Sequence, residues 1–245
     1  MTNLYFKYVW DVKTRRVTVL RGHGDFVNSV FVDPASRTVF SASDDCSIAL
    51  WDLDTRRIIK RFEGHVGPVQ QVIPMPPEFE MDEQDLADLR HEYDTDTDAE
   101  HEASGLTPPP SLENTPIFPH DPERPNPTPA YIVTAGLDST IRLWHVASGR
   151  CLRTYFGHLE GIWSIKADNL RIVSTSEDGM VKVWCPNTGQ CQRTFTGHQG
   201  PVTCCSLTGE RLITGGEDCE IRIMNFSEDV GSSQGGARGR NETPA

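Results

Sequence analysis

Long apolar runs are absent from this sequence. No stretch of the 245 residues approaches the roughly 18 consecutive apolar residues that a membrane helix needs. The start, MTNLYFKYVWDVK, also lacks the apolar core of a secretory signal. We therefore expect a chain that resides in the nucleus, the cytoplasm or both, with no membrane partner.

Cysteine is present but not in a pattern that binds metal or forms disulfides. None of the seven cysteines forms a Cys-x-x-Cys pair, and their spacing matches no zinc ligand set. His91, His101 and His120 stand among carboxylates, again without a regular spacing. A phosphate-binding loop and a Gly-rich nucleotide motif are missing too. The sequence therefore predicts reduced thiols, no metal, no cofactor and no enzyme.

Positive charge is scarce in one segment of the chain, residues 76–130, where acidic residues are in large excess. The net charge is -12, and residues 76–130 alone hold fifteen Asp and Glu against two Arg, a balance of -13. The rest of the chain is close to neutral, at +1, which predicts no nucleic-acid partner. The acidic segment also holds eleven of the seventeen prolines. Such a segment buries too little apolar surface to fold, so we expect disorder in 76–130, and likewise in the tail 226–245.

The remainder of the chain is a repeat. Gly-His pairs recur at residues 22–23, 64–65, 157–158 and 197–198, which are 42, 93 and 40 positions apart. The long interval equals one period plus the acidic insertion. After each pair come three short apolar strands separated by turns, such as FVNSVFV, RTVFSAS and CSIALWD in the first copy. A period near 40 with Gly-His and Trp-Asp ends resembles the WD40 repeat, the unit of β-propellers.

This resemblance implies an all-β fold of propeller blades with one long acidic insertion. We place WD40 repeats in residues 1–225, at about 16–51, 58–144, 150–184 and 190–224. YVWDV at 8–12 reads as the end of one further strand. Four repeats and this strand make an incomplete propeller. We expect either that the chain is part of a longer protein, which is the favoured interpretation, or that copies combine.

A polar set repeats in register with the Gly-His pairs. In each copy a His, a Ser or Thr, an Asp and a Trp should form one buried hydrogen-bond network. The fourth copy has Met224 in place of Trp, so its set is one bond short. The sets are His23, Ser41, Asp45, Trp51; His65, Thr134, Asp138, Trp144; His158, Ser174, Asp178, Trp184; and His198, Thr214, Asp218.

Ser, His and Asp together also suggest nucleophilic hydrolysis. Against that alternative, the set occurs four times, lies within strands and tight turns, and includes an aromatic donor that no catalytic triad uses. We therefore interpret the set as structural.

The amino-acid sequence of the repeats resembles that of a narrower group of WD40 proteins. LRGHGDFVNSVFVDPASRTVFSASDDCSIALWDLDTRR, STIRLWHVASGRCLRTYFGHLEGIWSI and RTFTGHQGPVTC are similar to the C-terminal half of fungal sulfur controller proteins. Those F-box WD40 proteins repress sulfur assimilation and carry an acidic insertion after a QQV strand. The resemblance implies a substrate receptor of an SCF-type ubiquitin ligase that binds a bZIP activator of sulfur genes. Skp1 and cullin would be partners only through an upstream F-box.

A binding surface is expected where the d-a and b-c loops of the blades lie. Three positions in each copy should reach it: three and five after the His, and one before the Asp. None of these twelve residues is Arg or Lys, so an apolar or basic protein segment is the expected ligand, with Trp163 as its anchor. The alternative is that Trp163 packs under a neighbouring loop. The twelve are Phe26, Asn28, Asp44, Pro68, Gln70, Leu137, Gly161, Trp163, Glu177, Pro201, Thr203 and Glu217.

The insertion holds candidate phosphorylation sites. Three threonines precede proline and two precede an acidic residue, and phosphates there would add to the existing negative charge. The alternative is a passive linker. The candidate sites are Thr95, Thr97, Thr107, Thr115 and Thr128.

The sequence thus predicts a non-enzymatic protein-binding module, the substrate-recognition part of a ubiquitin ligase. A general WD40 scaffold without a ligase role is the alternative.

Overall fold

The structure is a computed structural model that describes residues 7–11, 15–81, 117–118 and 129–226. Every regular element in these ranges is a β-strand, which confirms the all-β prediction. The strands form one two-stranded ribbon and four blades, each an antiparallel sheet whose strands follow chain order. The acidic segment separates the first and second strands of the second blade.

The blades contain four, four, four and three strands. The ribbon pairs β1 (Lys7–Asp11) with β2 (Arg16–Leu20). Blade 1 comprises β3 (Val27–Asp33), β4 (Thr38–Ser43), β5 (Ser47–Asp52) and β6 (Arg57–Glu63). Blade 2 comprises β7 (Val69–Pro74), β8 (Tyr131–Gly136), β9 (Ile141–His145) and β10 (Cys151–Tyr155). Blade 3 comprises β11 (Ile162–Ala167), β12 (Ile172–Ser176), β13 (Val181–Trp184) and β14 (Cys191–Phe195). Blade 4 comprises β15 (Val202–Leu207), β16 (Arg211–Gly216) and β17 (Ile221–Asn225).

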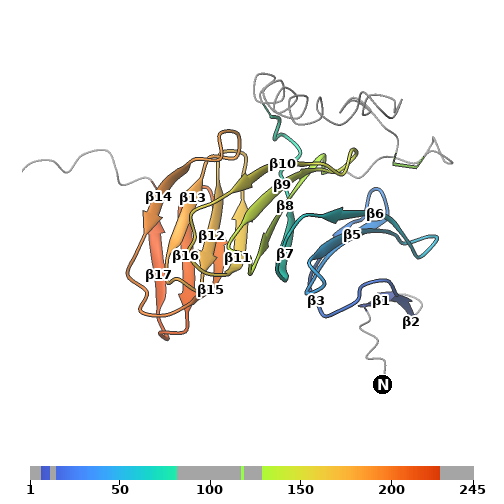
Figure 1. The fold of residues 1–245 in the computed structure, drawn as a ribbon, viewed down its shortest axis with the longest axis horizontal. Helices are drawn as coiled ribbons and strands as arrows, with labels where there is room; N and C mark the ends of the chain where they lie inside the picture. Colours follow the sequence, from blue (N-terminus) through green and yellow to red (C-terminus); the bar gives the residue numbers. More distant parts are fainter. Residues whose placement is uncertain (1–6, 12–14, 82–116, 119–128, 227–245) are drawn as a thin grey trace, which may run out of the picture.

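The blades follow one another along an open arc. Figure 1 shows the ribbon β1–β2 at one side of the arc and β17 at the other. The first strand of each blade packs against the first strand of the next, since β3, β7, β11 and β15 are neighbours in that order. The structure therefore agrees with the predicted incomplete propeller.

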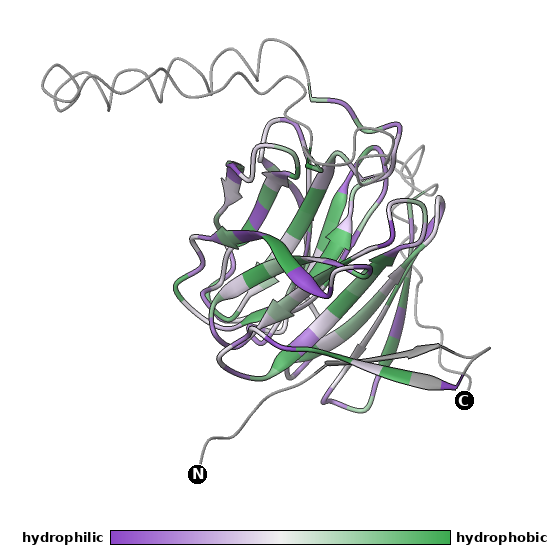
Figure 2. Ribbon diagram, turned by 90° about the vertical axis from the view of Figure 1, so that its right-hand side faces the viewer, coloured by the Kyte–Doolittle hydropathy of each residue, from purple (hydrophilic) through white to green (hydrophobic). Residues whose placement is uncertain are grey.

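Apolar side chains fill the spaces between blades. The strands alternate hydrophobic and hydrophilic residues along much of their length, as the banded colouring of Figure 2 shows. One core cluster joins blades 1 and 2 through Phe40, Phe62 and Trp144, and another joins blades 2 and 3 through Tyr155 and Trp184. β4 and β8 are buried along nearly their whole length, on both faces of their sheets, which explains why their residues are almost entirely apolar or small.

Two parts of the acidic insertion are packed, contrary to the expectation of disorder over 76–130. Phe79 and Met81 are buried in the cluster between blades 2 and 3, and Ile117 and Phe118 in the cluster between blades 1 and 2. The Phe79 ring meets Tyr131 edge-on at 5.4 Å between centroids. These are isolated apolar residues in an acidic, Pro-rich stretch, and average composition conceals them. Most of the insertion, 82–116 and 119–128, lies outside the described residues.

We expect Phe79→Ala to lower the free energy of unfolding by about 3–5 kcal/mol, because it removes a buried ring from the core. Phe156→Ala is the matched control, since Phe156 is 73% exposed. Chemical denaturation of the full chain measures both. Equal stability of the two variants would show that the segment after β7 does not pack on the blades.

Candidate functional site

One hydrogen-bond network holds the turns of each blade together. In blade 3, His158 lies in the loop before β11, Asp178 in the turn between β12 and β13, and Ser174 in β12. The His158 Nδ1 lies 2.8 Å from Asp178 Oδ2, and its Nε2 lies 2.7 Å from Ser174 Oγ. Trp184 Nε1 donates to the same Ser174 Oγ over 2.8 Å. Four residues that are far apart in sequence are thus tied into one set.

A single arrangement of protons satisfies every group in this set. Asp178 can only accept when ionised, so His158 donates from Nδ1 and its Nε2 must accept. Trp184 can only donate, so Ser174 accepts from Trp184 and donates its own proton to His158. Asp178 also accepts from the backbone amides of Leu159 and Met180. The network therefore fixes the loop before β11 and the turn after β12 at once.

The same geometry recurs in the other blades. In blade 1, His23 lies 2.8 Å from Asp45 and 2.7 Å from Ser41. In blade 2, His65 takes the same place between Asp138 and Thr134. In blade 4, His198 contacts Asp218 and Thr214 in this way. Trp51 and Trp144 supply the indole donor in blades 1 and 2. Blade 4 has no such donor, because Met224 occupies the position.

The pKa values of the four network aspartates lie below the ordinary value for Asp. Burial raises the pKa of Asp45, but hydrogen bonds from Ser47, the Gly24 amide and His23 outweigh this effect. Together they bring the pKa down to about 2. Burial likewise raises the pKa of Asp138, and the hydrogen bond from His65 lowers it. The pKa of Asp138 is also about 2. Burial lowers the pKa of His158 below its ordinary 6.5, against the opposing effect of Asp178. Near neutral pH, the Asp45 and Asp138 carboxylates are therefore ionised and the His158 imidazole is neutral.

The triad-like spacing does not make these sets nucleophilic. Ser174 is completely buried, and its oxygen already accepts from Trp184. An attacking oxygen needs a free lone pair and access to substrate. Two of the four sets carry Thr in place of Ser, and these hydroxyls, on Thr134 and Thr214, are equally buried. The sets fasten strands and leave no room for a reacting group.

The predicted surface residues lie directly beside these networks. Backbone hydrogen bonds join the position three after each His to the position before each Asp. Thus the Asp44 amide donates to the Phe26 carbonyl, and the Glu177 amide donates to the Gly161 carbonyl. Leu137 pairs with Pro68, and Glu217 with Pro201, in the same way. The structure therefore brings two of the three predicted positions together in every blade.

The third predicted position sits at a β-bulge in each blade. The pairing register shifts across Asn28, Gln70, Trp163 and Thr203, so each lacks a direct partner on the next strand. Bulges redirect side chains at sheet ends. Asn28 uses this freedom to donate to Asp44 over 2.6 Å and to the Val69 carbonyl over 3.0 Å. It therefore spans blades 1 and 2.

Exposure divides the twelve predicted residues. Phe26, Asn28, Glu177, Thr203 and Glu217 are exposed. Six are partly buried: Asp44, Pro68, Gln70, Leu137, Trp163 and Pro201. Gly161 is buried. Trp163 stays a predicted anchor, although its Nε1 is enclosed and has no hydrogen-bond partner among the described residues. Its partly buried ring favours neither binding nor packing under a loop on its own.

Sequence reasoning missed two exposed apolar residues on this surface. Val66 and Leu159, each directly after the Gly-His pair, are 86% and 76% exposed. Their amides donate to Asp138 and Asp178, so the backbone is fixed while the side chains face solvent. The signal that could have found them is the apolar residue type at a position that the network holds at the surface. With Phe26 they make the surface partly apolar.

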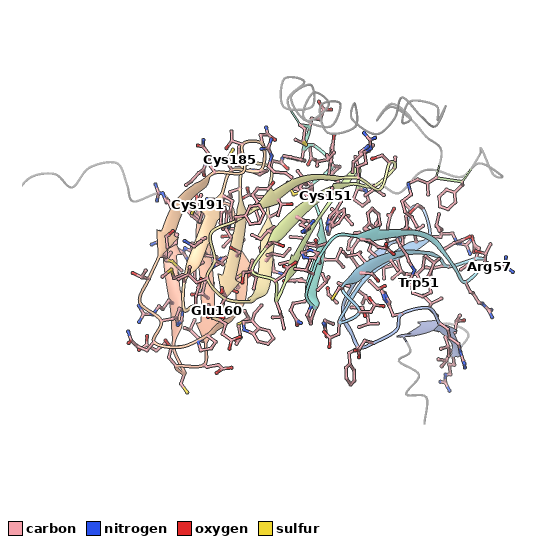
Figure 3. All side chains as sticks on the ribbon, in the orientation of Figure 1. Trp51, Arg57, Cys151, Glu160, Cys185 and Cys191 are labelled. Carbon is pink, nitrogen blue, oxygen red and sulfur yellow. The ribbon has the colours of Figure 1, made fainter. Side chains whose placement is uncertain are left out.

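This surface forms one rim of the arc. Glu160, in the same loop as Leu159, lies at the lower rim in Figure 3, whereas Cys151 and Cys185 lie at the upper one. Residues 75–81 leave β7 at that upper rim (Figure 1). The insertion therefore starts on the rim opposite the predicted binding surface. The five candidate threonines lie outside the described residues.

Comparison with known proteins agrees with the repeat geometry. The model of the family described as "WD domain, G-beta repeat" matches residues 14–52, 124–145, 149–185 and 189–225. The chain belongs to this WD40 family. The second match begins at residue 124, near the end of the insertion, and β7 supplies the strand that it leaves out.

Several fungal relatives share the sequence of these WD40 repeats. A protein named "Probable E3 ubiquitin ligase complex SCF subunit sconB" from Talaromyces stipitatus is 56% identical over 156 residues, which are 64% of this chain and 23% of that protein. Proteins of the same name from Emericella nidulans and Aspergillus terreus are 52% and 53% identical over 63% of this chain. The chain spans about a quarter of the length of these relatives.

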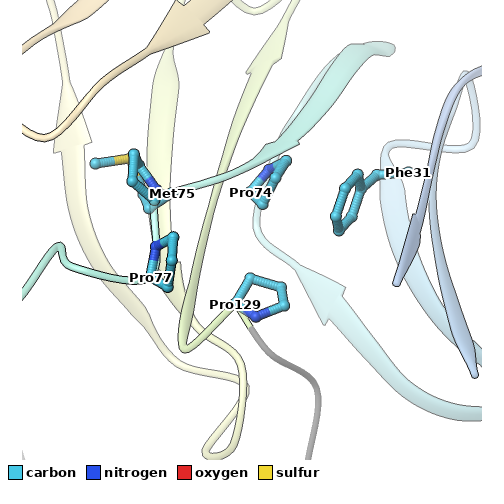
Figure 4. A pocket seen from close by; sticks show the side chains of 6 residues that line it. Phe31, Pro74, Met75, Pro77 and Pro129 are labelled. Carbon is cyan, nitrogen blue, oxygen red and sulfur yellow. The ribbon is translucent and has the colours of Figure 1, made fainter. Parts of the chain in front are cut away.

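An apolar pocket opens at the rim where the insertion begins. Its volume is about 360 Å³ (Figure 4). The lining side chains carry no titratable or nucleophilic group, so the pocket offers contact surface but no acid-base chemistry. It is lined by Phe31, Pro74, Met75, Pro76, Pro77 and Pro129.

The described residues lack a metal-binding cluster and a membrane-spanning helix. They contain no group of three or more His, Cys, Asp or Glu placed to hold a metal ion. They also contain no helix long and apolar enough to cross a membrane.

We expect Asp178→Ala to lower the free energy of unfolding by about 1–3 kcal/mol, because it leaves the buried His158 donor unpaired. Asp218→Ala should have a smaller effect, since its network lacks a Trp donor and its blade ends the arc. Thermal melts of the full chain compare the two. Equal shifts, or a larger one for Asp218→Ala, would contradict the link between a complete network and stability.

Acidification should destabilise the WD40 blades in two stages. The pKa of His158 is lowered on folding, so the unfolded chain binds its proton first and stability falls below about pH 6.5. The pKa of Asp45 is lowered to about 2, so its contribution is complete above about pH 4 and is lost between about pH 4 and 2. Melting temperature measured from pH 8 to 2 tests this. A melting temperature that stays level down to pH 4 would contradict the first stage.

Proposed function

We propose that the chain is the substrate-binding WD40 part of an SCF-type ubiquitin ligase that controls the transcription of sulfur-metabolism genes. The main support is its 52–56% identity to relatives named as SCF subunits, over 63–64% of the chain. In this proposal the chain performs no catalytic step. A bZIP activator of sulfur genes is the proposed substrate, and Skp1 and cullin contact other parts of the longer ligase subunit. Nuclear or cytoplasmic residence stays a prediction.

The chemistry of the lower rim supports a basic, partly apolar ligand. Phe26, Val66 and Leu159 present apolar side chains to solvent. Glu177 and Glu217 are exposed beside them, and neither takes part in an ion pair given by the structure. A guanidinium or ammonium group on a bound segment would pair with these carboxylates, whereas a phosphorylated segment would meet like charge. The ligand is thus expected to be a basic, non-phosphorylated segment of the substrate.

The acidic insertion has a separate proposed role. It begins at the upper rim, so phosphorylation at its threonines would act on ligase assembly or turnover without affecting substrate affinity. A passive linker is the alternative for this segment.

Charge reversal on the lower rim tests the binding proposal. Peptides tiled along basic regions of candidate substrates are titrated into the full chain by fluorescence anisotropy. We expect Glu177→Lys with Glu217→Lys to weaken binding of a basic peptide about tenfold or more. Glu210→Lys, an exposed acidic residue in the β15–β16 loop, should change the Kd less than about twofold. Tighter binding of the reversed variant, or preference of the native chain for phosphorylated peptides, would overturn the proposed ligand class.

A chimera tests the ligase role. The matching WD40 region of an Emericella relative is replaced by this chain, and transcripts of sulfur-assimilation genes are measured with excess sulfur. Restored repression, together with loss of repression in the Glu177→Lys, Glu217→Lys chimera, supports the substrate-receptor role. Peptide binding without repression would favour a general WD40 scaffold.

A further inference from the structure

Lysine is rare in this chain, although arginine is common. Of the 23 basic residues, five are lysine and the other eighteen are arginine. No lysine occurs between Lys60 and Lys166, a stretch that includes the whole acidic insertion. Lysine is among the commonest residues of soluble domains. This preference for arginine therefore calls for a physical reason. The five lysines are Lys7, Lys13, Lys60, Lys166 and Lys182.

The two kinds of cation also differ in exposure. Blades 1 to 3 hold every lysine whose side chain the structure describes, and these three lysines, Lys60, Lys166 and Lys182, are partly buried. Lysine is ordinarily a surface residue, so the lack of an exposed lysine among the described side chains is unusual. In the same blades and the loops that join them, six arginines are exposed. The six are Arg21, Arg37, Arg56, Arg57, Arg61 and Arg193.

Two of the lysines have amino groups that are held in place. Lys60 Nζ donates to the Ala147 carbonyl of the next blade, and its side chain packs on Gly149. Burial lowers the pKa of Lys60, so its enclosure, rather than its charge, restricts its reactivity. Lys182 Nζ donates to Thr194 Oγ1 on the neighbouring strand over 3.1 Å. Neither amine projects freely into solvent.

At one exposed arginine, contacts explain the residue type. Arg61 donates from Nη1 to Ser47 Oγ over 3.1 Å and from Nη2 to the Gly22 carbonyl over 2.5 Å. A planar guanidinium makes both bonds at once, whereas an ammonium is a compact point charge. Arginine therefore has a structural role at this position.

At two other exposed arginines, contacts do not explain it. Arg56 and Arg57 lie at the turn into β6, and Figure 3 shows Arg57 at the outer end of blade 1. The structure gives neither guanidinium a hydrogen bond or an ion pair among the described residues. A solvated ammonium would carry the same charge at both positions. The choice of arginine there has a reason other than folding.

Lysine and arginine differ in the reaction that a ubiquitin ligase promotes. A neutral lysine amine attacks the carbonyl carbon of the thioester between the C-terminus of ubiquitin and a cysteine of the conjugating enzyme. An amide bond forms, the carbon–sulfur bond breaks, and the departing sulfur takes the proton that the nitrogen loses. A guanidinium stays protonated in proteins, so arginine does not undergo this step.

We propose that the exposed surface of blades 1 to 3 is kept free of ubiquitin acceptors, so that the ligase modifies its substrate and not this chain. The inference rests on the proposed function. A receptor is part of its own ligase, so an exposed lysine on it would meet the thioester at a high effective concentration. Exposed arginine supplies the same positive charge without an acceptor nitrogen.

Charge-preserving substitutions test this in an assembled ligase. The chimera with the Emericella relative is reconstituted with Skp1, cullin and the activating and conjugating enzymes, and modified lysines are mapped by mass spectrometry. We expect Arg56→Lys with Arg57→Lys and Arg193→Lys to raise the ubiquitin on this chain about threefold or more. The new lysines should carry it. Leaving out the cullin should abolish the increase.

Glutamine at the same three positions is the matched control. Arg56→Gln with Arg57→Gln and Arg193→Gln removes the guanidinium groups without adding an amine, so ubiquitin on the chain should stay at the native level. In cells, the half-life of the chimera should fall about twofold or more for the lysine variant only. An equal fall for the glutamine variant would show that the arginines stabilise the fold, which would overturn the proposal.

The remaining outcomes separate this proposal from the proposed function. If the lysine variant gains no ubiquitin while sulfur-gene repression persists, the proposal is wrong and the ligase role stands. Modification of Lys60, Lys166 or Lys182 in the native chimera to the level of the added lysines would also overturn the proposal. A native chimera that neither represses these genes nor directs ubiquitin transfer would overturn the ligase role, and this proposal with it.

Discussion

The bond between the histidine before each first strand and the aspartate after each second strand is the contact on which the blades depend. It joins two connections that otherwise share one backbone bond and a bond from a serine hydroxyl to a backbone carbonyl in blades 1 and 3. In blade 3, burial raises the pKa of Asp178, but hydrogen bonds from His158 and two backbone amides lower it overall. Burial lowers the pKa of His158, so an ionised carboxylate there faces the Nδ1–H of a neutral imidazole. That choice leaves Nε2 as the acceptor, which determines the direction of the Ser or Thr hydroxyl and so of the Trp donor. One carboxylate thereby orders residues from four segments of each complete blade.

The repeat made this network predictable, because residues that lie one period apart occupy the same place in successive blades. Once Asp178 was aligned with Asp45, its partners followed from the first copy. The same reasoning identified Met224 as the position without a donor. It could not identify Val66 and Leu159 as exposed, since apolar residues in an amphipathic pattern are ordinarily assigned to the core. Only the bonds from their amides show that their backbone is held at the surface.

The insertion shows the limit of compositional reasoning. Average charge and proline content describe the whole of residues 76–130, but packing depends on single side chains. Phe79 and Met81 lie within a few residues of β7, and the open space beside Tyr131 is already apolar. A ring so close to an ordered strand loses little further chain entropy when it packs. Ile117 and Phe118 could not have been predicted, because nothing local to them marks a partner in blade 1 or blade 2.

Comparing equivalent positions in successive blades distinguishes two kinds of surface, the rims of the blades and the faces between them. At the rims, the residue types change from blade to blade while the backbone repeats: Asn28, Gln70, Trp163 and Thr203 share a bulge but not a chemistry. Variation on a constant frame is suited to contact with an irregular ligand, for which each blade supplies a different group. On the faces between blades the residues stay apolar, including the exposed Val30 and Val32 on β3 and the exposed Ile221 and Ile223 on β17. Ile221 and Ile223 occupy the positions that Val181 and Val183 occupy in blade 3, where the two valines pack against blade 4. The rim residues thus vary on a repeated backbone, whereas the residues on the faces between blades keep one apolar character.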